Sequence, residues 1–179
     1  MKYLILIFLI YSCQSKNLDK KKYSYQNTYI PIILNFLVEN NLDNCCIKSG
    51  NCLIIESEAY INNSSCSFQF WTFIKNNKMN SHESPIDYTF IKRNIGKRNK
   101  LETIDILEID CIELIDQNVN LPEGAISFSP MIPYKSGNKF EVWMTIASPH
   151  PVKEIRFIME NKNDQLVVIN YEYSDYCIY

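Results

Sequence analysis

The chain has 179 residues, of which 46% are hydrophobic and 21% are charged, and this composition predicts one folded domain rather than a disordered chain. Its formal net charge of −2 provides no global basic field for nucleic acid, so no nucleic-acid partner is expected. Because only four glycines and two histidines occur, glycine-rich phosphate-binding loops and histidine-based clusters are largely excluded. The composition does not reveal a biochemical activity.

The first residues predict export from the cell. Lys2 supplies a positive charge, and residues 3–11 form an unbroken apolar run. As a helix this run would span about 14 Å, less than half of a hydrocarbon core of about 30 Å, so it is too short to cross a membrane. A short basic segment followed by an apolar run of this length is typical of a secretory signal.

The end of this signal, Ile10-Tyr11-Ser12-Cys13, resembles the lipobox of bacterial lipoproteins. Ile10 matches the branched apolar position, Ser12 matches the small position before the cleavage site, and Cys13 matches the cysteine that receives the diacylglycerol. Tyr11 is bulky for its position. The resemblance covers residues 1–13 and implies a lipoprotein held in a membrane by acyl chains, at the periplasm, outer membrane or cell surface. The alternative is an ordinary cleaved signal and a secreted protein.

We therefore divide the chain into three parts. Residues 1–12 are the predicted signal peptide, and residues 13–26 are the predicted lipidated cysteine with a flexible basic tether. This tether contains four lysines and one aspartate, and each lysine near a bilayer can contribute about 1 kcal/mol of attraction to anionic head groups. Residues 27–179 are the predicted single domain.

The first half of this domain predicts one helix and several strands. Residues 28–42 place apolar side chains at helical spacing, which is typical of an amphipathic helix packed on a core. Residues 52–59 and 66–74 are rich in β-forming residues and flank the polar turn 62–65, so we expect two strands. Residues 87–92 are a further strand candidate. Residues 101–116 fit a helix or a strand with a bulge, and their five isoleucines favour the strand.

The second half predicts a β-meander. Residues 139–146 alternate strictly, with Phe140 and Val142 on one side and Glu141 and Trp143 on the other. Residues 152–159 and 165–173 flank the polar turn 161–164, which predicts a hairpin. An N-terminal helix packed on a predominantly antiparallel sheet that ends in this meander gives an α+β fold class.

Charge is unevenly distributed along the domain. Residues 75–100 are mainly basic, whereas residues 101–123 contain seven acids and no base. Such segments usually form solvated faces that pair with each other. Two sharper interpretations are a basic surface that binds an anionic protein or an anionic cell surface, and an acidic face that binds a cationic partner. The candidate contact residues lie around Gly96: Arg93, Lys97, Arg98 and Lys100.

Six cysteines remain if Cys13 carries lipid: Cys45, Cys46, Cys52, Cys66, Cys111 and Cys177. In an exported protein they are candidates for three disulfides, and fifteen connectivities are possible. Cys52 and Cys66 are suited to tie the first two strands to the loop that holds Cys45 and Cys46. No CxxC or HxxxH spacing occurs, so we predict no metal site and no redox motif. Buried reduced thiols are the remaining option.

Catalytic motifs are also missing from the sequence. There is no GxSxG or HExxH pattern, and we predict no catalytic residue and no cofactor. Glu56 and Glu58 share a strand face, which a solvated face explains as well as an acid–base pair does. The leading hypothesis is an exported, lipid-anchored binding module. The alternatives are a secreted, disulfide-stabilised inhibitor or immunity-type protein, and a small hydrolase that uses His82 or His150.

Overall fold

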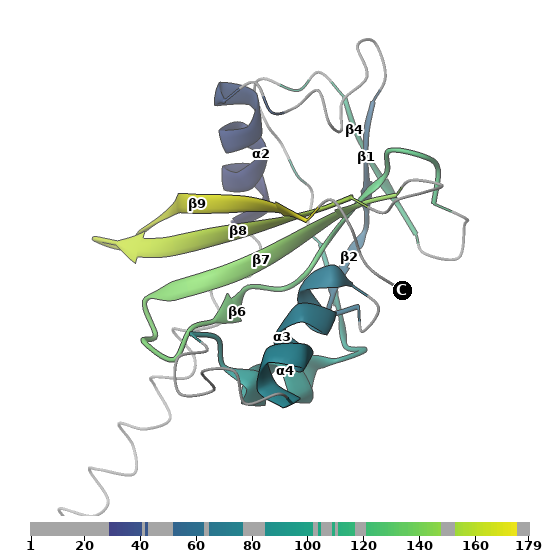
Figure 1. Ribbon diagram of the computed structural model, residues 1–179. Coiled ribbons are helices and arrows are strands. Elements are labelled where there is room, and N and C mark those ends of the chain that lie inside the picture. The colour runs from purple at the N-terminus through teal and green to yellow at the C-terminus, as the bar shows by residue number, and fades with distance from the viewer. Residues whose placement is uncertain are drawn as a thin grey trace, which may run out of the picture.

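The computed structural model describes residues 29–40, 42, 52–62, 65–76, 85–101, 104, 109, 111–116, 121–147 and 153–174. A twisted sheet lies at the centre of the domain (Figure 1). Helix α2 (Tyr29–Glu39) covers one face of this sheet, and helices α3 (Cys66–Asn76) and α4 (Tyr88–Asn94) lie at the other face. Within the described residues, no helix is both long enough and apolar enough to span a bilayer.

The main sheet is mixed but mostly antiparallel. Its strand order is β4-β1-β5-β7-β8-β9, and β6 also pairs with β7. Strand β1 runs parallel to β4 and β5, whereas the other pairs are antiparallel. The strands are β1 (Leu53–Glu56), β4 (Ile112–Ile115), β5 (Ile126–Phe128), β6 (Ile132–Pro133), β7 (Lys139–Ile146), β8 (Lys153–Lys162) and β9 (Gln165–Ser174). The predicted α+β class is confirmed.

Helix α2 forms over the predicted segment because its apolar residues recur every three or four positions. Ile33 and Leu37 point into the main core, where they join Phe157 and Met144 from the sheet. The ring of Phe36 meets that of Phe157 edge to face, with their centroids 6.3 Å apart. This apolar face is the stabilising core of the domain.

The predicted C-terminal meander is also confirmed. Strands β7, β8 and β9 follow one another along the chain and in the sheet. The hairpin between β8 and β9 turns on Asn163 and Asp164, both of which have positive φ angles, of 53° and 63°. Short polar side chains tolerate this left-handed conformation, which is the one that tight two-residue hairpin turns require.

Two predicted strands are helices. Residues 66–74 lie within α3 and residues 87–92 lie mostly within α4. Asp87 caps α4, since its side chain accepts hydrogen bonds from the amides of Thr89 and Phe90. The Ser65 hydroxyl likewise accepts from the Phe68 amide at the start of α3. These caps and the packing of the aromatic side chains outweigh the β propensity of both segments.

The first predicted strand is interrupted at Ser57. Strand β1 ends at Glu56, and β2 (Glu58–Tyr60) pairs antiparallel with β3 (Arg98–Lys100) in a separate two-stranded sheet. The Ser57 backbone bonds both Ile115 and Leu101, so the chain changes sheets at this residue. Within 101–116, the end of the segment forms β4 as predicted, and most of the rest lies outside the described residues.

Candidate functional site

The face of the sheet opposite α2 carries a row of polar side chains. Ile55 pairs with Ile126 and points to the main core, so the next residues, Glu56 and Ser127, point to the opposite face. Ser127 then pairs with Thr145 on β7, and Thr145 pairs with Glu154 on β8. A polar row therefore crosses four adjacent strands, with a buried carboxyl group at each end.

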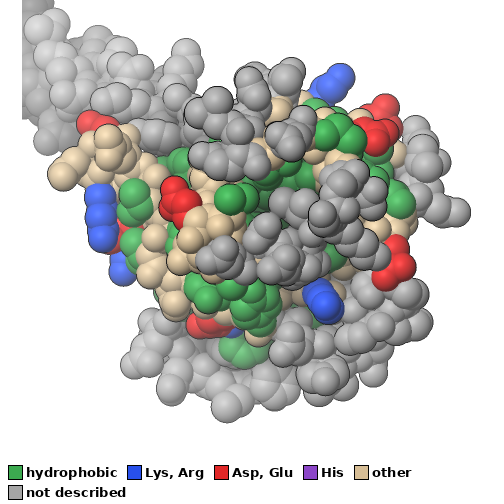
Figure 2. Space-filling model, turned by 90° about the horizontal axis from the view of Figure 1, so that it is seen from above, with side chains coloured by type: hydrophobic (Ala, Val, Ile, Leu, Met, Phe, Trp, Pro, Cys, Tyr) green, Lys and Arg blue, Asp and Glu red, His purple; other side chains and the backbone are tan. Residues whose placement is uncertain are grey.

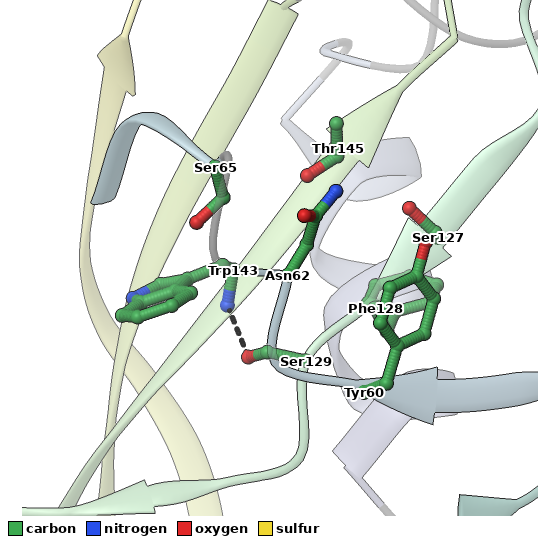
Figure 3. Close-up of a pocket in the computed structure, with 8 residues that line it drawn as sticks. All are labelled: Tyr60, Asn62, Ser65, Ser127, Phe128, Ser129, Trp143 and Thr145. Atoms are coloured by element: carbon green, nitrogen blue, oxygen red, sulfur yellow. Dashed lines mark hydrogen bonds between the residues drawn. The ribbon is translucent and has the colours of Figure 1, made fainter. Parts of the chain in front are cut away.

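A pocket opens over the middle of this row (Figure 3). It contains about 210 Å³ of space, part of which is open to solvent. Its wall combines hydroxyl and amide groups with aromatic rings, contributed by Tyr60, Asn62, Ser65, Ser127, Phe128, Ser129, Trp143 and Thr145. These residues come from β2, the segment before α3, β5 with the residue that follows it, and β7, so the pocket exists only in the folded chain.

The hydroxyl groups of this pocket differ in how they are used. Ser129 Oγ accepts from the Trp143 amide at 2.9 Å and donates to the Pro130 carbonyl at 3.0 Å. Ser127 and Thr145 make no side-chain hydrogen bond with a described residue, and both are half-buried. Such hydroxyls can bind water or one small polar group. The enclosed part of this space is only about 10 Å³, which is room for about one water molecule and far less than a ligand of drug size needs.

Glu154, beside the pocket, caps helix α3. It is 1% exposed, and its Oε1 accepts from the Ser67 amide at 2.7 Å and from the Ser67 hydroxyl. The positive end of the helix dipole favours a carboxylate at this place. Burial nevertheless raises the pKa of Glu154, and the Ser67 contacts oppose that shift. The residue joins β8 to a helix distant in sequence.

A second apolar core lies beneath α3 and α4, and it includes the two tryptophans, Trp71 and Trp143. Glu141 lies beside them. It is 2% exposed, and its Oε1 accepts from both indoles of the chain, from Trp71 Nε1 at 2.9 Å and Trp143 Nε1 at 2.7 Å. The Tyr134 hydroxyl donates to Oε2 at 3.3 Å. Burial raises the pKa of Glu141, and the indole hydrogen bonds oppose this effect. The aromatic groups around it make this carboxyl a structural junction rather than an accessible catalytic group.

The guanidinium of Arg156 extends this arrangement outward. It lies 4.9 Å from the Phe70 ring centroid and 5.8 Å from that of Trp71, and it forms an ion pair with Glu172 on β9. Cation–π contacts of this kind favour Arg over Lys. Arg156 therefore links α3 to the outer strands of the sheet.

Glu56 does not form an acid–base pair with Glu58. The side chain of Glu56 is fully buried and burial raises its pKa, whereas Glu58 is half-buried on another strand and pairs with Arg98 at 3.1 Å. The solvated face expected for both residues is therefore wrong for Glu56. Because the chain passes from the main sheet to the two-stranded sheet at Ser57, the two carboxyl groups lie in different surroundings.

These three buried glutamates predict a dependence of stability on pH. Because burial raises the pKa of Glu56, Glu141 and Glu154 above the ordinary value of 4.5, the folded chain binds protons more tightly than the unfolded chain. The free energy of unfolding should therefore rise as the pH falls from 7 towards 4.5, and should decline again as the pH rises through the folded-state values.

Urea unfolding at a series of pH values measures this effect. Single Glu→Gln variants at the three positions should each reduce the slope, whereas the exposed control Glu123→Gln should leave it unchanged. A flat profile for the parent chain over this range would contradict the assignment.

The predicted contact residues Arg93, Lys97, Arg98 and Lys100 lie together on α4, the following turn and β3, and all four are exposed. We call them the basic rim. Arg98 is engaged, since it pairs with Glu58 and its guanidinium lies 5.0 Å from the Tyr60 ring centroid. The other three form no ion pair with a described residue. The exposed Ile95, at 40%, lies between them in the chain.

A different face of the molecule has mixed charge. Figure 2 shows basic and acidic side chains at separate places around the margin of the face seen from above, with hydrophobic side chains between them. Neither sign dominates that face.

Of the disulfide candidates, Cys52 is bonded to Cys111. This bond joins the residues immediately before β1 and β4, which are neighbouring parallel strands. The expected tie between Cys52 and the loop of Cys45 and Cys46 is therefore wrong, because sheet pairing brings Cys111 to it instead. Cys66 is also disulfide-bonded.

Several predicted residues lie outside the described part of the chain: Cys13, Cys45, Cys46, Cys177, His82 and His150. The signal peptide and tether lie outside it as well. Among the described residues, no group of three or more His, Cys, Asp or Glu side chains is placed to hold a metal ion.

Comparison with protein-family models, curated proteins and solved structures found no match to this chain.

The sequence analysis predicted neither the pocket nor the burial of Glu141 and Glu154. One signal was present: Trp143 shares the apparently polar side of β7 with Glu141, and a tryptophan on that side indicates burial. Nothing in the local sequence indicated that Ser127, Thr145 and Glu154 occupy adjacent strands.

Proposed function

We propose that this chain is an exported, lipid-anchored protein whose folded domain acts by binding an anionic partner. Cys13 is the proposed anchor, and two or three acyl chains on it would give stable membrane attachment, whereas one chain gives only marginal binding. The proposed location is the periplasm, the outer membrane or the cell surface. The proposed binding surface is the basic rim.

The observation that supports export is the Cys52–Cys111 disulfide. Disulfides persist in oxidising compartments and are rare in the cytosol. Both cysteines are exposed, so a reducing compartment would have access to the bond. This agrees with the secretory signal predicted from residues 1–12.

The observation that carries the binding function is the exposure of the basic rim. Arg93, Lys97 and Lys100 have no carboxylate partner among the described residues, so their charges are available to another molecule. Lys92 adds a further exposed charge at the end of α4. Basic residues in the last turn of a helix also complement its dipole, but Lys97 and Lys100 lie beyond that helix.

One set of variants tests both parts of this proposal. In an exporting bacterial host, the parent chain should be processed and found in the membrane fraction, and Cys13→Ser should remain an unacylated precursor. Normal processing and membrane retention of Cys13→Ser would contradict the anchor. Release of the processed parent chain into the medium would favour the secreted alternative.

The binding arm uses purified Cys13→Ser protein and immobilised polyglutamate as an anionic probe. Arg93→Glu/Lys97→Glu should lose most of the salt-sensitive binding, whereas Lys135→Glu/Lys153→Glu, which makes the same charge change at exposed sites outside the basic rim, should retain it. Equal losses in both double variants would show that net charge, rather than the basic rim, determines binding.

A further inference from the structure

Strand β9 is an open edge of the main sheet. It is the last strand in the sheet order and pairs only with β8 among the described residues. It contains ten residues, which makes it one of the two longest strands. Its exposed side chains include Ile169 at 37% and Tyr173 at 47%. Figure 1 shows β9 at the margin of the sheet, with α2 on the face rather than along the edge.

Among the described residues, this edge lacks most of the features that prevent pairing with another strand. Proteins protect exposed edges with lysine, proline, short strands, β-bulges or covering segments. Strand β9 contains no Lys, Arg or Pro, and its single charge, Glu172, is paired with Arg156. It has one protective feature, a bulge at Ile169, which lies between the partners of Ile158 and Met159 and leaves a regular run of residues on each side. The opposite edge, β4, has only four residues.

The side chains of β9 are arranged for pairing with a copy of themselves. On the face that α2 covers, Leu166 and Val168 lie at one end, and Tyr171 and Tyr173 lie at the other. Antiparallel pairing of two β9 strands places the aromatic end of each beside the aliphatic end of the other, which is a favourable cross-strand combination. It also moves the two Glu172 carboxylates to opposite ends of the pair.

We propose that β9 is a dimerisation edge, at which a second copy of this chain pairs antiparallel about a two-fold axis and extends the sheet across both copies. A closed two-fold contact uses the same surface on both partners, as this arrangement requires. The low charge of the edge argues against a partner chosen by electrostatic complementarity, and the main-chain groups of β9 supply the pairing.

The test measures molecular mass over a series of protein concentrations. The full chain with Cys13→Ser excludes association through acyl groups, and its mass should rise from 21.1 kDa towards twice that value. Ile169→Lys places two like charges near the two-fold axis and should weaken the dimer roughly tenfold or more. The matched control is Leu114→Lys, which makes the same change at an exposed residue of β4 and should dimerise as the parent does.

Hydrogen exchange gives a second measurement. Amides of residues 165–174 should exchange more slowly at high protein concentration in the parent chain, and this protection should be lost in Ile169→Lys. A chain that stays monomeric at all concentrations would overturn the proposal. So would a dimer that survives Ile169→Lys, or one that Leu114→Lys disrupts equally, because the contact would then lie elsewhere.

Discussion

Replacing Glu141 by Leu is expected to lower the free energy of unfolding by about 2–6 kcal/mol, because two buried indole N–H groups lose their acceptor and each unsatisfied donor costs about 1–3 kcal/mol. The carboxyl group is 2% exposed, so water cannot readily replace it. Urea unfolding followed by tryptophan fluorescence measures the loss directly, since both tryptophans of the chain donate to this group.

Two variants make this result specific. Glu141→Gln keeps an acceptor oxygen for the indoles and should lose much less stability than Glu141→Leu. Glu113→Leu makes the same chemical change at an exposed position of β4 and should have little effect, as most exposed substitutions do. If Glu141→Leu is as stable as the parent chain, the carboxyl group is not the junction that its contacts indicate.

The second large effect is expected from loss of the Cys52–Cys111 disulfide. The bond joins residues 59 positions apart, and the chain-entropy model assigns about 4 kcal/mol to the closure of a loop of this length. The double variant Cys52→Ser/Cys111→Ser should therefore unfold at a markedly lower urea concentration. The weakened region should be the parallel pair of β1 and β4, which the bond joins at one end.

The double variant is preferable to chemical reduction, because Cys66 is also disulfide-bonded and reduction would break both bonds. The parent chain in its oxidised form is the reference. Equal unfolding midpoints for the two proteins, with the parent shown to be oxidised by its thiol count, would contradict a stabilising role for this bond.

The helices show where local sequence was sufficient and where it was not. Helix α2 was predictable because its apolar residues follow one period over the whole element. In α3 the aromatic residues Phe68, Phe70 and Trp71 give the segment high β propensity. Contacts with distant parts of the chain decide its conformation instead, because Ser67 bonds Glu154 and Trp71 bonds Glu141. For α4, Asp87 as an N-cap and Lys92 in the last turn were available signals.

The candidate site was the least predictable part of the chain. Its pocket is assembled from β2, β5, β7 and the segment before α3, and no spacing rule relates these segments. Exposure of the basic rim agrees with the expectation from a charged segment around Gly96. Export, anchoring at Cys13 and the anionic partner remain predictions.

The sequence by itself determined the α+β class, the helix that packs on the sheet and the C-terminal meander, because a period of 3.6 or 2 residues is a local property that burial of one face selects. Only the tertiary structure decided that Cys52 bonds Cys111, that Glu141 and Glu154 are buried, and that β9 forms an open edge. Strand order and burial depend on contacts between segments that are distant in the chain. These contacts are determined by pairing across the sheet and not by any local sequence pattern.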